Sequence, residues 1–339
     1  MKIIKTEDAV GLILCHDMTQ IVPGKIKDAA FRKGHIVRKE DVEVLLSMGK
    51  EHLYVWENDE TKYHENEAAE KLVEICKGEN IGYGSVKEGK IDLFAEVDGI
   101  FEIDEARTKN VNAIGELVIA TRGNNFPVKK GEKLAGTRVV PLVIDKSKLG
   151  IAKIISGNEP LMKITPFVHK KVALIITGSE VFHGRIEDKF GPALAEKLKE
   201  YDTEIISKSI LSDSQEDITE EIKKKIKEGA DMILCTGGMS VDPDDTTPTA
   251  IKATGANIIS YGAPVLPGSM FMIAYTENGI PIMGLPGCVM YSRRTIFDLV
   301  LPKIMANKIV TPDYLAGLGV GGLCLDCVTC IYPNCGFGR

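Results

Sequence analysis

Several oxygen-bearing side chains directly follow a glycine turn near the middle of the sequence. The stretch from Ala230 to Ala250 (ADMILCTGGMSVDPDDTTPTA) begins as an apolar strand and breaks at a glycine pair. Glycine tolerates the backbone angles of a tight turn and leaves room for a close ligand. The turn and the polar side chains that follow it are Thr236, Gly237, Gly238, Ser240, Asp242, Asp244 and Asp245.

These residue types predict phosphate chemistry assisted by a divalent cation. We expect a helix to restart with Thr247 as its N-cap and Pro248 as its first residue. A strand, a glycine turn and a helix start together make an anion site at the carboxyl edge of a sheet. Asp242, Asp244 and Asp245 would repel a bare phosphate, but they could hold Mg²⁺ against phosphate oxygens. The alternative is an ordinary acidic loop that caps a helix.

The C-terminal residues carry a second set of chemically active groups. Four of the eight cysteines, Cys324, Cys327, Cys330 and Cys335, form a Cys-x2-Cys-x2-Cys-x4-Cys run. Such a run can wrap one metal centre, either an iron–sulfur cluster or Zn²⁺; four unligated reduced thiols are the remaining option. Nearby glycines predict a flexible arm that could carry this site to a partner or to the chain's own active edge. They are Gly317, Gly319, Gly321 and Gly322.

Length, composition and charge limit the number of domains, the kinds of partner and the cellular location that we expect. A chain of 339 residues is long for one domain, so two or three are expected. The net charge is -6 and no dense Lys/Arg block occurs, which argues against a nucleic-acid partner. No apolar run approaches the roughly 20 residues that span a bilayer, so no membrane partner is expected. The N-terminal MKIIKTEDAVG has acids where a signal peptide is apolar, which predicts a cytoplasmic protein.

The first two sections of the chain predict small modules. Residues 1–60 are expected to form an α+β module, with strands at 2–5, 12–15 and 52–55 and a helix that ends at Gly49. Residues 59–64 are charged and without periodicity, which is typical of a linker. Residues 65–165 are expected to be mostly β, with one or two helices, the first at 68–76. Their strands are predicted at 91–97, 99–103, 115–120 and 139–144.

The third section, residues 168–310, predicts an α/β domain. Strands are expected at 172–176, 204–206, 232–235, 257–260, 271–275 and 280–285, and helices at 191–201, 215–228 and 289–305. Alternating strands and helices favour a mostly parallel sheet with helices on both faces. If the sheet is parallel, the turns at 177–179, 236–238 and 285–287 meet at one edge.

A series of motifs over residues 171–310 resembles the molybdopterin-binding domain shared by the MogA/MoaB, MoeA and CinA groups. In order, they are TGSEV, GRIEDKFGPALAEKL, SDSQEDI, CTGGMSVDPDDTTPTA, PGSMF and GLPG. The resemblance implies a three-layer α/β/α, MogA-like domain. The first module resembles the MoeA N-terminal region through FRKGHIVRKEDVEVLLSMGKEHLYV, but the sequence lacks the MoeA Asp-Gly-Tyr signature.

The resemblance also implies a ligand and a set of site residues. Proteins of this family bind molybdopterin or its adenylylated form across the sheet edge. Asp188, Asp242 and Asp245 would carry the catalytic positions, and Asp242, Asp244 and Asp245 the Mg²⁺. The ligand would contact Thr177, Gly178, Ser179, Glu180, Asp213, Thr236, Gly237, Gly238 and Ser240, and also Pro267, Gly268, Ser269, Gly284, Pro286 and Gly287.

The resemblance leaves several functions open. MogA-type members transfer AMP from MgATP to molybdopterin, and MoeA-type members use the adenylylated product and molybdate to insert the metal. The chain could instead be a non-catalytic carrier or sensor whose cysteine tail contacts a molybdoenzyme. A CinA-like pyrophosphatase acting on nucleotides such as ADP-ribose is the third option. Members usually self-associate, so a homo-oligomer is expected.

Three residues near the last motif have two interpretations each. Arg293 and Arg294 are placed by the sequence in the last helix, where either could reach a phosphate or face solvent. Cys288 follows Leu-Pro-Gly at the start of that helix, where a thiol pKa can fall. Because the family more often has Asn there, no catalytic role is expected for it.

Overall fold

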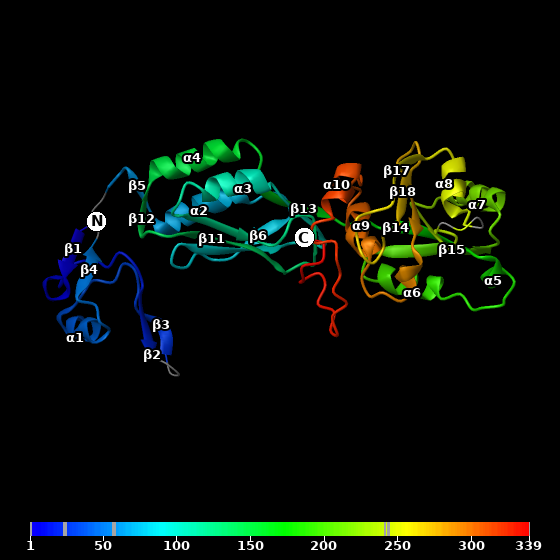
Figure 1. The fold of residues 1–339 in the computed structure, drawn as a ribbon. Helices are drawn as coiled ribbons and strands as arrows, with labels where there is room; N and C mark the ends of the chain where they lie inside the picture. Colours follow the sequence, from blue (N-terminus) through cyan, green and yellow to red (C-terminus); the bar gives the residue numbers. More distant parts are fainter. Residues whose placement is uncertain (1, 23–25, 56–58, 241, 243–244, 339) are drawn as a thin grey trace. The chain divides into compact units, whose positions relative to one another are not determined.

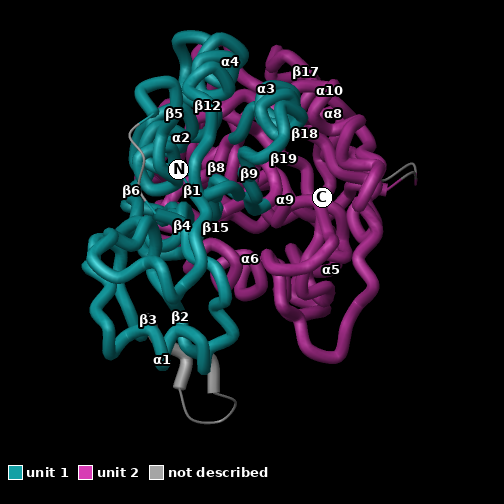
Figure 2. The backbone as a smooth tube through the Cα atoms, turned by 90° about the vertical axis from the view of Figure 1, so that its left-hand side faces the viewer, with its two compact units in different colours: residues 1–96, 103–122, 131–163 teal, residues 97–102, 123–130, 164–339 magenta. Residues whose placement is uncertain are grey.

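The described residues fall into two compact units. The structure, a computed structural model, describes residues 2–22, 26–55, 59–240, 242 and 245–338 (Figure 1). Unit 1 comprises residues 1–96, 103–122 and 131–163, and unit 2 comprises residues 97–102, 123–130 and 164–339 (Figure 2). No helix among the described residues is long and apolar enough to cross a membrane.

Unit 1 begins with a small α+β segment. Strand β1 (Lys2–Lys5) pairs antiparallel with β4 (His52–Val55). The 3-10 turn η1 (Thr6–Asp8) and helix α1 (Lys39–Ser47) lie between these two strands in the sequence. The strand expected at 12–15 is wrong, since Ile13 and Leu14 form only isolated bridges. The sequence reasoning also missed the hairpin of β2 (Met18–Val22) and β3 (Ile26–Phe31). The core of this segment is made by Ala9, Leu14, Met18, Val37, Leu45 and Leu53.

The rest of unit 1 holds a four-stranded antiparallel sheet in the order β6-β7-β11-β9. The strands are β6 (Ile81–Tyr83), β7 (Lys90–Ala95), β9 (Leu117–Thr121) and β11 (Lys133–Val139). Strand β5 (Lys62–His64) pairs with β12 (Val143–Asp145). There are three helices where one or two were expected: α2 (Glu65–Cys76), α3 (Glu105–Asn112) and α4 (Lys146–Ser156). Helix α4 was missed although Leu149, Ala152 and Ser156 are buried at helical spacing.

Unit 2 is built on a six-stranded sheet in the order β15-β14-β16-β19-β18-β17. Strands β15, β14, β16 and β19 run parallel, and β18 and β17 are added antiparallel. The bounds are β14 (Lys170–Thr177), β15 (Thr203–Leu211), β16 (Met232–Thr236), β17 (Asn257–Tyr261), β18 (Met272–Tyr275) and β19 (Pro281–Leu285). A separate three-stranded sheet joins β10 (Phe126–Val128), β8 (Gly99–Ile103) and β13 (Met162–Pro166). The predicted mostly parallel sheet is confirmed.

Helices cover both faces of the six-stranded sheet. Successive residues of β14 point to opposite faces, so that Val172 and Leu174 pack in one apolar cluster and Ala173 and Ile175 in another. The first cluster includes helices α6 (Phe190–Leu198) and α9 (Ile296–Met305), and the second includes α7 (Gln215–Lys227) and α8 (Thr247–Ala253). A strand buried on both sides has a nearly continuous apolar sequence. The three-layer α/β/α prediction is therefore confirmed.

The last long helix begins later than expected. Residues Gly287–Met290 form a 3-10 turn, η2, and α9 starts only after Thr295. The Thr295 hydroxyl accepts from the Phe297 amide, and the Asp298 carboxylate accepts from the Thr295 amide at 2.7 Å. This capping box fixes the helix start, so that Arg293 and Arg294 precede the helix instead of lying in it.

The glycine-rich segment after helix α10 (Pro312–Gly317) is docked on unit 2, and the flexible arm expected there is wrong. The Leu266 amide donates to the Gly322 carbonyl and the Cys324 amide to the Leu266 carbonyl, both at 2.8 Å. Phe337 is buried in the cluster around α9. A Cβ atom at Gly322 would overlap the Leu318 carbonyl, so this glycine permits close packing. We call residues 319–338 the cysteine tail.

Candidate functional site

The glycine turns of unit 2 meet at one edge of the sheet. In the parallel ladder Ile176 pairs with Thr236, and Thr236 pairs with Leu285. The chain therefore leaves β14, β16 and β19 at adjacent positions. Met272, at the start of the antiparallel strand β18, lies opposite Gly284, which brings the preceding segment 267–271 to the same side. We call this region, formed by the turns at 177–180, 236–240, 267–269 and 284–287, the carboxyl edge.

Three buried threonines join the turns after β14 and β16 to the start of α8. The Thr177 hydroxyl donates to the Thr236 carbonyl at 3.2 Å and lies 3.1 Å from the Thr247 hydroxyl. The Thr247 hydroxyl donates to the Gly237 carbonyl at 2.8 Å. Thr247 is thus the first helical residue, preceded by Thr246 as N-cap, and its side chain holds the turn instead of capping the helix. The expected N-cap was wrong by one residue.

Glycine is required at position 237 by two independent constraints. Its φ is +87°, in the left-handed region that favours glycine. A Cβ atom there would also overlap the carbonyl oxygen of Thr177. Gly238 has φ +52°, and Gly178, at the first turn, has φ +139°. The backbones of two turns therefore come into direct contact, whereas the sequence had predicted only a tight turn with room for a close ligand.

The hydroxyl of Thr236 is buried without a hydrogen-bond partner among the described residues. Thr236 is completely shielded from solvent at the last position of β16. A buried hydroxyl left unpaired costs about 1–3 kcal/mol, and in a native protein such a group calls for an explanation. A ligand that bonds to Thr236 at the carboxyl edge would supply one.

Asp213 connects two more parts of the carboxyl edge. Its carboxylate accepts from the Ser179 amide at 2.8 Å, at the start of the short helix α5 (Ser179–Phe182). Its carbonyl accepts from the Thr246 hydroxyl at 2.7 Å. Asp213 therefore positions the two turns, and Glu180, next to Ser179, is exposed beside them.

The described acidic residues after the second turn lie on one bend. The Asp242 amide donates to the Asp245 carboxylate at 3.1 Å, and the Asp245 amide donates to the Asp242 carbonyl at 2.9 Å. Asp242 is exposed and Asp245 half-buried, while Asp244 lies outside the described residues. The Tyr261 hydroxyl donates to the carbonyls of Met239 and Ser240 at 3.2 and 3.4 Å. Burial, and then the nearby Asp245 carboxylate, raise the pKa of Tyr261, so it remains a donor at neutral pH.

Two carboxylates on one bend fit Mg²⁺ but not a metal held by protein groups alone. Mg²⁺ usually takes one or two protein carboxylates and completes its shell with water and substrate phosphate oxygens. Across the part of the chain that the structure describes, no group of three or more His, Cys, Asp or Glu side chains is arranged to hold a metal ion. Asp242 and Asp245 would therefore need a phosphorylated ligand to complete such a site.

Asp188 has structural partners at the start of α6. Its carboxylate accepts from the amides of Phe190 and Gly191 at 2.8 and 3.1 Å, and Lys208 lies 3.3 Å away. The side chain is nearly buried. These contacts make Asp188 a helix cap, and its predicted catalytic role stays a prediction.

The glycines that were expected to close the site differ in whether the structure requires a glycine there. Gly268 has φ +128° and would press a Cβ atom against Ile296, whose amide donates to Pro267. Gly284 lies against the Met239 side chain. At Gly287, by contrast, φ is not positive and a Cβ atom would meet no atom of the described residues within 4 Å. Neither folding nor packing explains this glycine, whereas an approaching ligand would. Ser269 and Pro286 lie on the same turns, and Ser269 is exposed.

Arg293 is exposed, as one of its two interpretations expected, whereas Arg294 and Cys288 differ from what the sequence suggested. Arg294 pairs with Glu200 at 2.6 Å and with Asp298 at 3.0 Å, and Arg293 donates to backbone carbonyls of the tail. Burial raises the pKa of the Cys288 thiol, whereas a helix start would lower it. Cys288 is half-buried in the 3-10 turn η2, and helix α9 begins only at Ile296, so that this thiol does not lie at the helix start.

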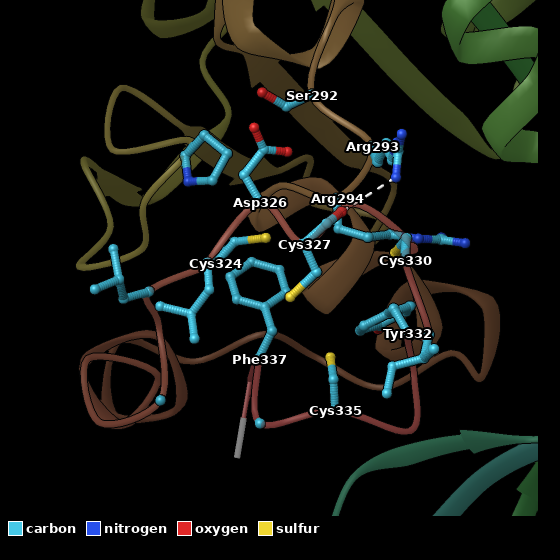
Figure 3. Close-up of a pocket in the computed structure, with 16 residues that line it drawn as sticks. Ser292, Arg293, Arg294, Cys324, Asp326, Cys327, Cys330, Tyr332, Cys335 and Phe337 are labelled. Carbon is cyan, nitrogen blue, oxygen red and sulfur yellow. Dashed lines mark hydrogen bonds between the residues drawn. The ribbon is translucent and has the colours of Figure 1, made fainter.

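The four cysteines of the tail line one cavity of about 450 Å³ (Figure 3). Cys327 and Cys330 are exposed, Cys324 and Cys335 are half-buried, and all four thiols are free. In Figure 3 the sulfur atoms of Cys324, Cys327 and Cys335 face the space between them. The tail therefore gathers the thiols that the spacing singled out, without a preformed metal geometry among the described residues.

Comparisons with known proteins fit the resemblance found in the sequence. Residues 173–306 match the family described as "Probable molybdopterin binding domain", and residues 3–57 match a family described as a domain of unknown function. A CinA-like protein of Mycobacterium sp. strain JLS is 33% identical over 90 residues, or 26% of this chain and 21% of that protein. The chain thus matches about a fifth of the length of the curated relative.

Two MoaB proteins are among the solved structures that this chain matches. The molybdopterin biosynthesis enzyme MoaB of Thermus thermophilus is 22% identical, covering 40% of this chain and 91% of that one, with a TM-score of 0.34. The tungsten cofactor synthesizing protein MoaB of Pyrococcus furiosus is 20% identical, covering 40% and 92%, with a TM-score of 0.33. The family match and the ordered motifs thus fall on the same part of the chain, since residues 173–306 are similar to the family described as "Probable molybdopterin binding domain".

Proposed function

We propose that the carboxyl edge binds molybdopterin or its adenylylated form, and that the protein acts in molybdenum cofactor synthesis by adenylyl transfer or molybdate insertion. The observation that carries this proposal is the buried hydroxyl of Thr236 where the glycine turns meet, which has no hydrogen-bond partner in the described part of the chain. The family match of the surrounding domain supports the choice of ligand.

Different residues of the carboxyl edge would contact different parts of the ligand. The turn from Thr236 to Ser240 would contact the phosphate or the pterin, together with the first turn from Thr177 to Glu180. Pro267, Gly268, Ser269, Gly284, Pro286 and Gly287 would close the pocket from the other side. Open space around Gly287 supports this placement.

Asp242 and Asp245, with Asp244 by sequence, would hold Mg²⁺ between the protein and the phosphates of the ligand or of ATP. The acids alone repel phosphate, so this arrangement predicts that tight binding requires the cation. Mg²⁺, when bound, neutralises charge on phosphate oxygens, which is the main demand of nucleotidyl transfer. The chain's own part is to position the phosphates and to donate hydrogen bonds to them.

Binding of molybdopterin to the full chain, with and without MgATP, tests the proposal. Thr236→Val keeps the shape of the side chain and removes the hydroxyl, and should weaken binding about tenfold, the loss of one hydrogen bond of about 1.4 kcal/mol. Asp245→Asn should abolish the Mg²⁺ dependence of binding. Asp313→Asn, an exposed acid at the start of α10, is the matched control and should bind normally. Unchanged binding by Thr236→Val and Asp245→Asn would remove the assignment.

Three assays separate the reactions that such a site could perform. They are AMP transfer from ATP to molybdopterin, molybdate-dependent insertion, and hydrolysis of ADP-ribose. The curated CinA-like relatives favour a CinA-like nucleotide pyrophosphatase as the second candidate. Binding without any of the three turnovers would instead support a carrier or sensor for molybdoenzyme maturation.

Four further properties belong to this proposal. We propose a cytoplasmic homo-oligomer, a tail that contacts a molybdoenzyme, and a metal centre, an iron–sulfur cluster or Zn²⁺, at the tail cysteines. Light scattering of the purified full chain would measure its oligomeric state. A monomer at micromolar concentration would remove the oligomer from the proposal. The metal centre is argued separately below.

A further inference from the structure

The cysteine tail is anchored at both ends and open in the middle. At one end, backbone hydrogen bonds join Cys324 and Gly322 to Leu266. At the other end, the Tyr332 hydroxyl donates to the Asp298 carbonyl at 2.9 Å, and Phe337 is buried. Cys324 and Cys335 therefore sit next to fixed points, while Cys327 and Cys330 lie on an exposed loop between them.

Large apolar side chains on this loop are exposed in a regular pattern. Leu325 is 78% exposed, Val328 94% and Ile331 58%, and each directly follows a cysteine. Exposing three such side chains is unfavourable, since burying each one is worth about 1.5–3 kcal/mol. The loop would gain this energy by folding over a bound group at the neighbouring thiols.

The size of the cavity favours a bound group of many atoms. Four thiolates around a single Zn²⁺ lie about 2.3 Å from it and leave no interior space. A cavity of about 450 Å³ is far larger than one ion requires. The three cysteines at x2 spacing also match the ligand run of bacterial iron–sulfur proteins. Both observations point to a cluster.

The charges around the cavity suit an anionic centre. A cluster with four thiolates is negatively charged, and Arg293 and Arg294 line the cavity. Arg293 donates to the carbonyls of Cys327 and Val328, at 3.2 and 2.6 Å, so its charge lies beside the loop. Arg294 stacks on the Tyr332 ring at 4.7 Å. Asp326 also lines the cavity and opposes this effect.

We propose that Cys324, Cys327, Cys330 and Cys335 ligate a [4Fe–4S] cluster in the tail cavity, and that the open loop closes over it. Each thiol releases its proton as its sulfur replaces a ligand of a preassembled cluster, so insertion involves no net oxidation or reduction. Coupling of metal binding to local folding is common where a site is not preformed. The inference does not depend on the ligand of the carboxyl edge.

Metal analysis of the full chain, purified without oxygen, tests the inference. We expect about four iron atoms and four acid-labile sulfide ions per chain. The protein should also show the visible absorption of a cluster, and an electron paramagnetic resonance signal after reduction by dithionite. Cys327→Ser and Cys330→Ser alter exposed side chains, so the fold should persist while iron falls below a tenth of that in the unmodified chain. Cys288→Ser, a cysteine outside the tail, is the matched control and should keep all its iron.

Several results would overturn the inference. One zinc per chain without sulfide would assign a Zn²⁺ site instead. Chains without metal even after anaerobic incubation with a preassembled [4Fe–4S] cluster held by small thiols would show that the tail cysteines do not ligate one, and equal iron in the tail variants would place the metal elsewhere. Molybdopterin binding measured on the same samples keeps failure here distinct from failure of the proposed function.

Discussion

The carboxyl edge and the cysteine tail solve the problem of building a site in opposite ways. The edge collects residues that are far apart in the sequence, such as Thr177, Thr236 and Thr247, and fixes them by buried hydrogen bonds at the ends of parallel strands. The tail takes all four of its thiols from one short segment that is anchored only at its ends. The comparison teaches that a site whose residues are held together by the packed sheet is rigid before its ligand binds. A site whose residues all come from one short segment can take its final geometry only when the ligand binds.

The largest effect on stability should come from Gly237→Ala, which disrupts the close contact between two turns of the carboxyl edge. The side chain would overlap the Thr177 carbonyl in addition to occupying a left-handed conformation. We expect a loss of about 4 kcal/mol in the free energy of unfolding of unit 2, at the exceptional end for one substitution. Gly255→Ala is the matched control, with the same φ of +87° and nothing within 4 Å, and should lose only about 1–2 kcal/mol.

Equal losses in the two alanine variants, measured by denaturant unfolding, would contradict the close contact between the turns. The carboxyl edge would then be no more tightly built than an exposed loop, and the contrast with the tail would disappear.

The second prediction tests the anchor of the tail. Arg294→Met removes one member of a nearly buried ion pair with Asp298, which still keeps Lys197 at 2.9 Å. We expect a loss of about 3 kcal/mol, at the lower end for breaking a buried pair. Because Arg294 also stacks on Tyr332, protease cleavage within residues 325–331 should become faster.

Arg185→Met serves as the control, since Arg185 is an exposed arginine of unit 2 that does not line the tail cavity. It should change stability by less than about 1 kcal/mol. Cleavage at equal rates in the two variants would show that Arg294 does not hold the tail.

The third prediction concerns the unpaired hydroxyl. Thr236→Val should raise the stability of the ligand-free protein by about 1 kcal/mol, because it removes a buried group without a partner. Thr177→Val, whose hydroxyl has two contacts, should lower stability by about 1–2 kcal/mol. Thermal unfolding of both variants compares them. A loss of stability in Thr236→Val would mean that its hydroxyl already has a partner.

The smallest effect is a difference in thiol reactivity between the two regions. Because burial raises the pKa of Cys288, its thiolate is scarce at pH 8 and increases as the pH rises toward that raised value. Iodoacetamide should therefore modify Cys327 and Cys330, which are exposed, well before Cys288 in metal-free protein. Peptide mass analysis over time measures the order. Early modification of Cys288 would contradict the partial burial of its thiol.

Much of unit 2 could be predicted because its local signals agree with one another. Strands such as 172–176 are apolar throughout, and helices such as 215–228 are amphipathic, so their types and approximate bounds followed directly. The meeting of the glycine turns at one edge followed from the parallel arrangement alone. The role of Gly237 was likewise visible in the choice of residue.

Other features depended on contacts between distant residues. The capping box of Thr295 and Asp298 makes the last long helix start later than expected, although the two residues were present in the sequence as a signal. The sequence placed Asp188 at a catalytic position, which stays a prediction, but did not show that its carboxylate accepts from the amides of residues 190 and 191. Glycines after α10 suggested mobility, because the sequence does not reveal that Phe337 returns to the core.

The return of the tail to the core has a consequence for how the protein can be dissected. Leu318, Tyr332 and Phe337 contribute to the apolar layer around α9, so a chain shortened at residue 318 would uncover that layer. Such a fragment would tend to aggregate for reasons unrelated to any cofactor. Single substitutions at exposed thiols therefore test the role of the tail with less disturbance of the fold than a truncation does. A fusion partner is better attached after residue 338 than substituted for the cysteine tail.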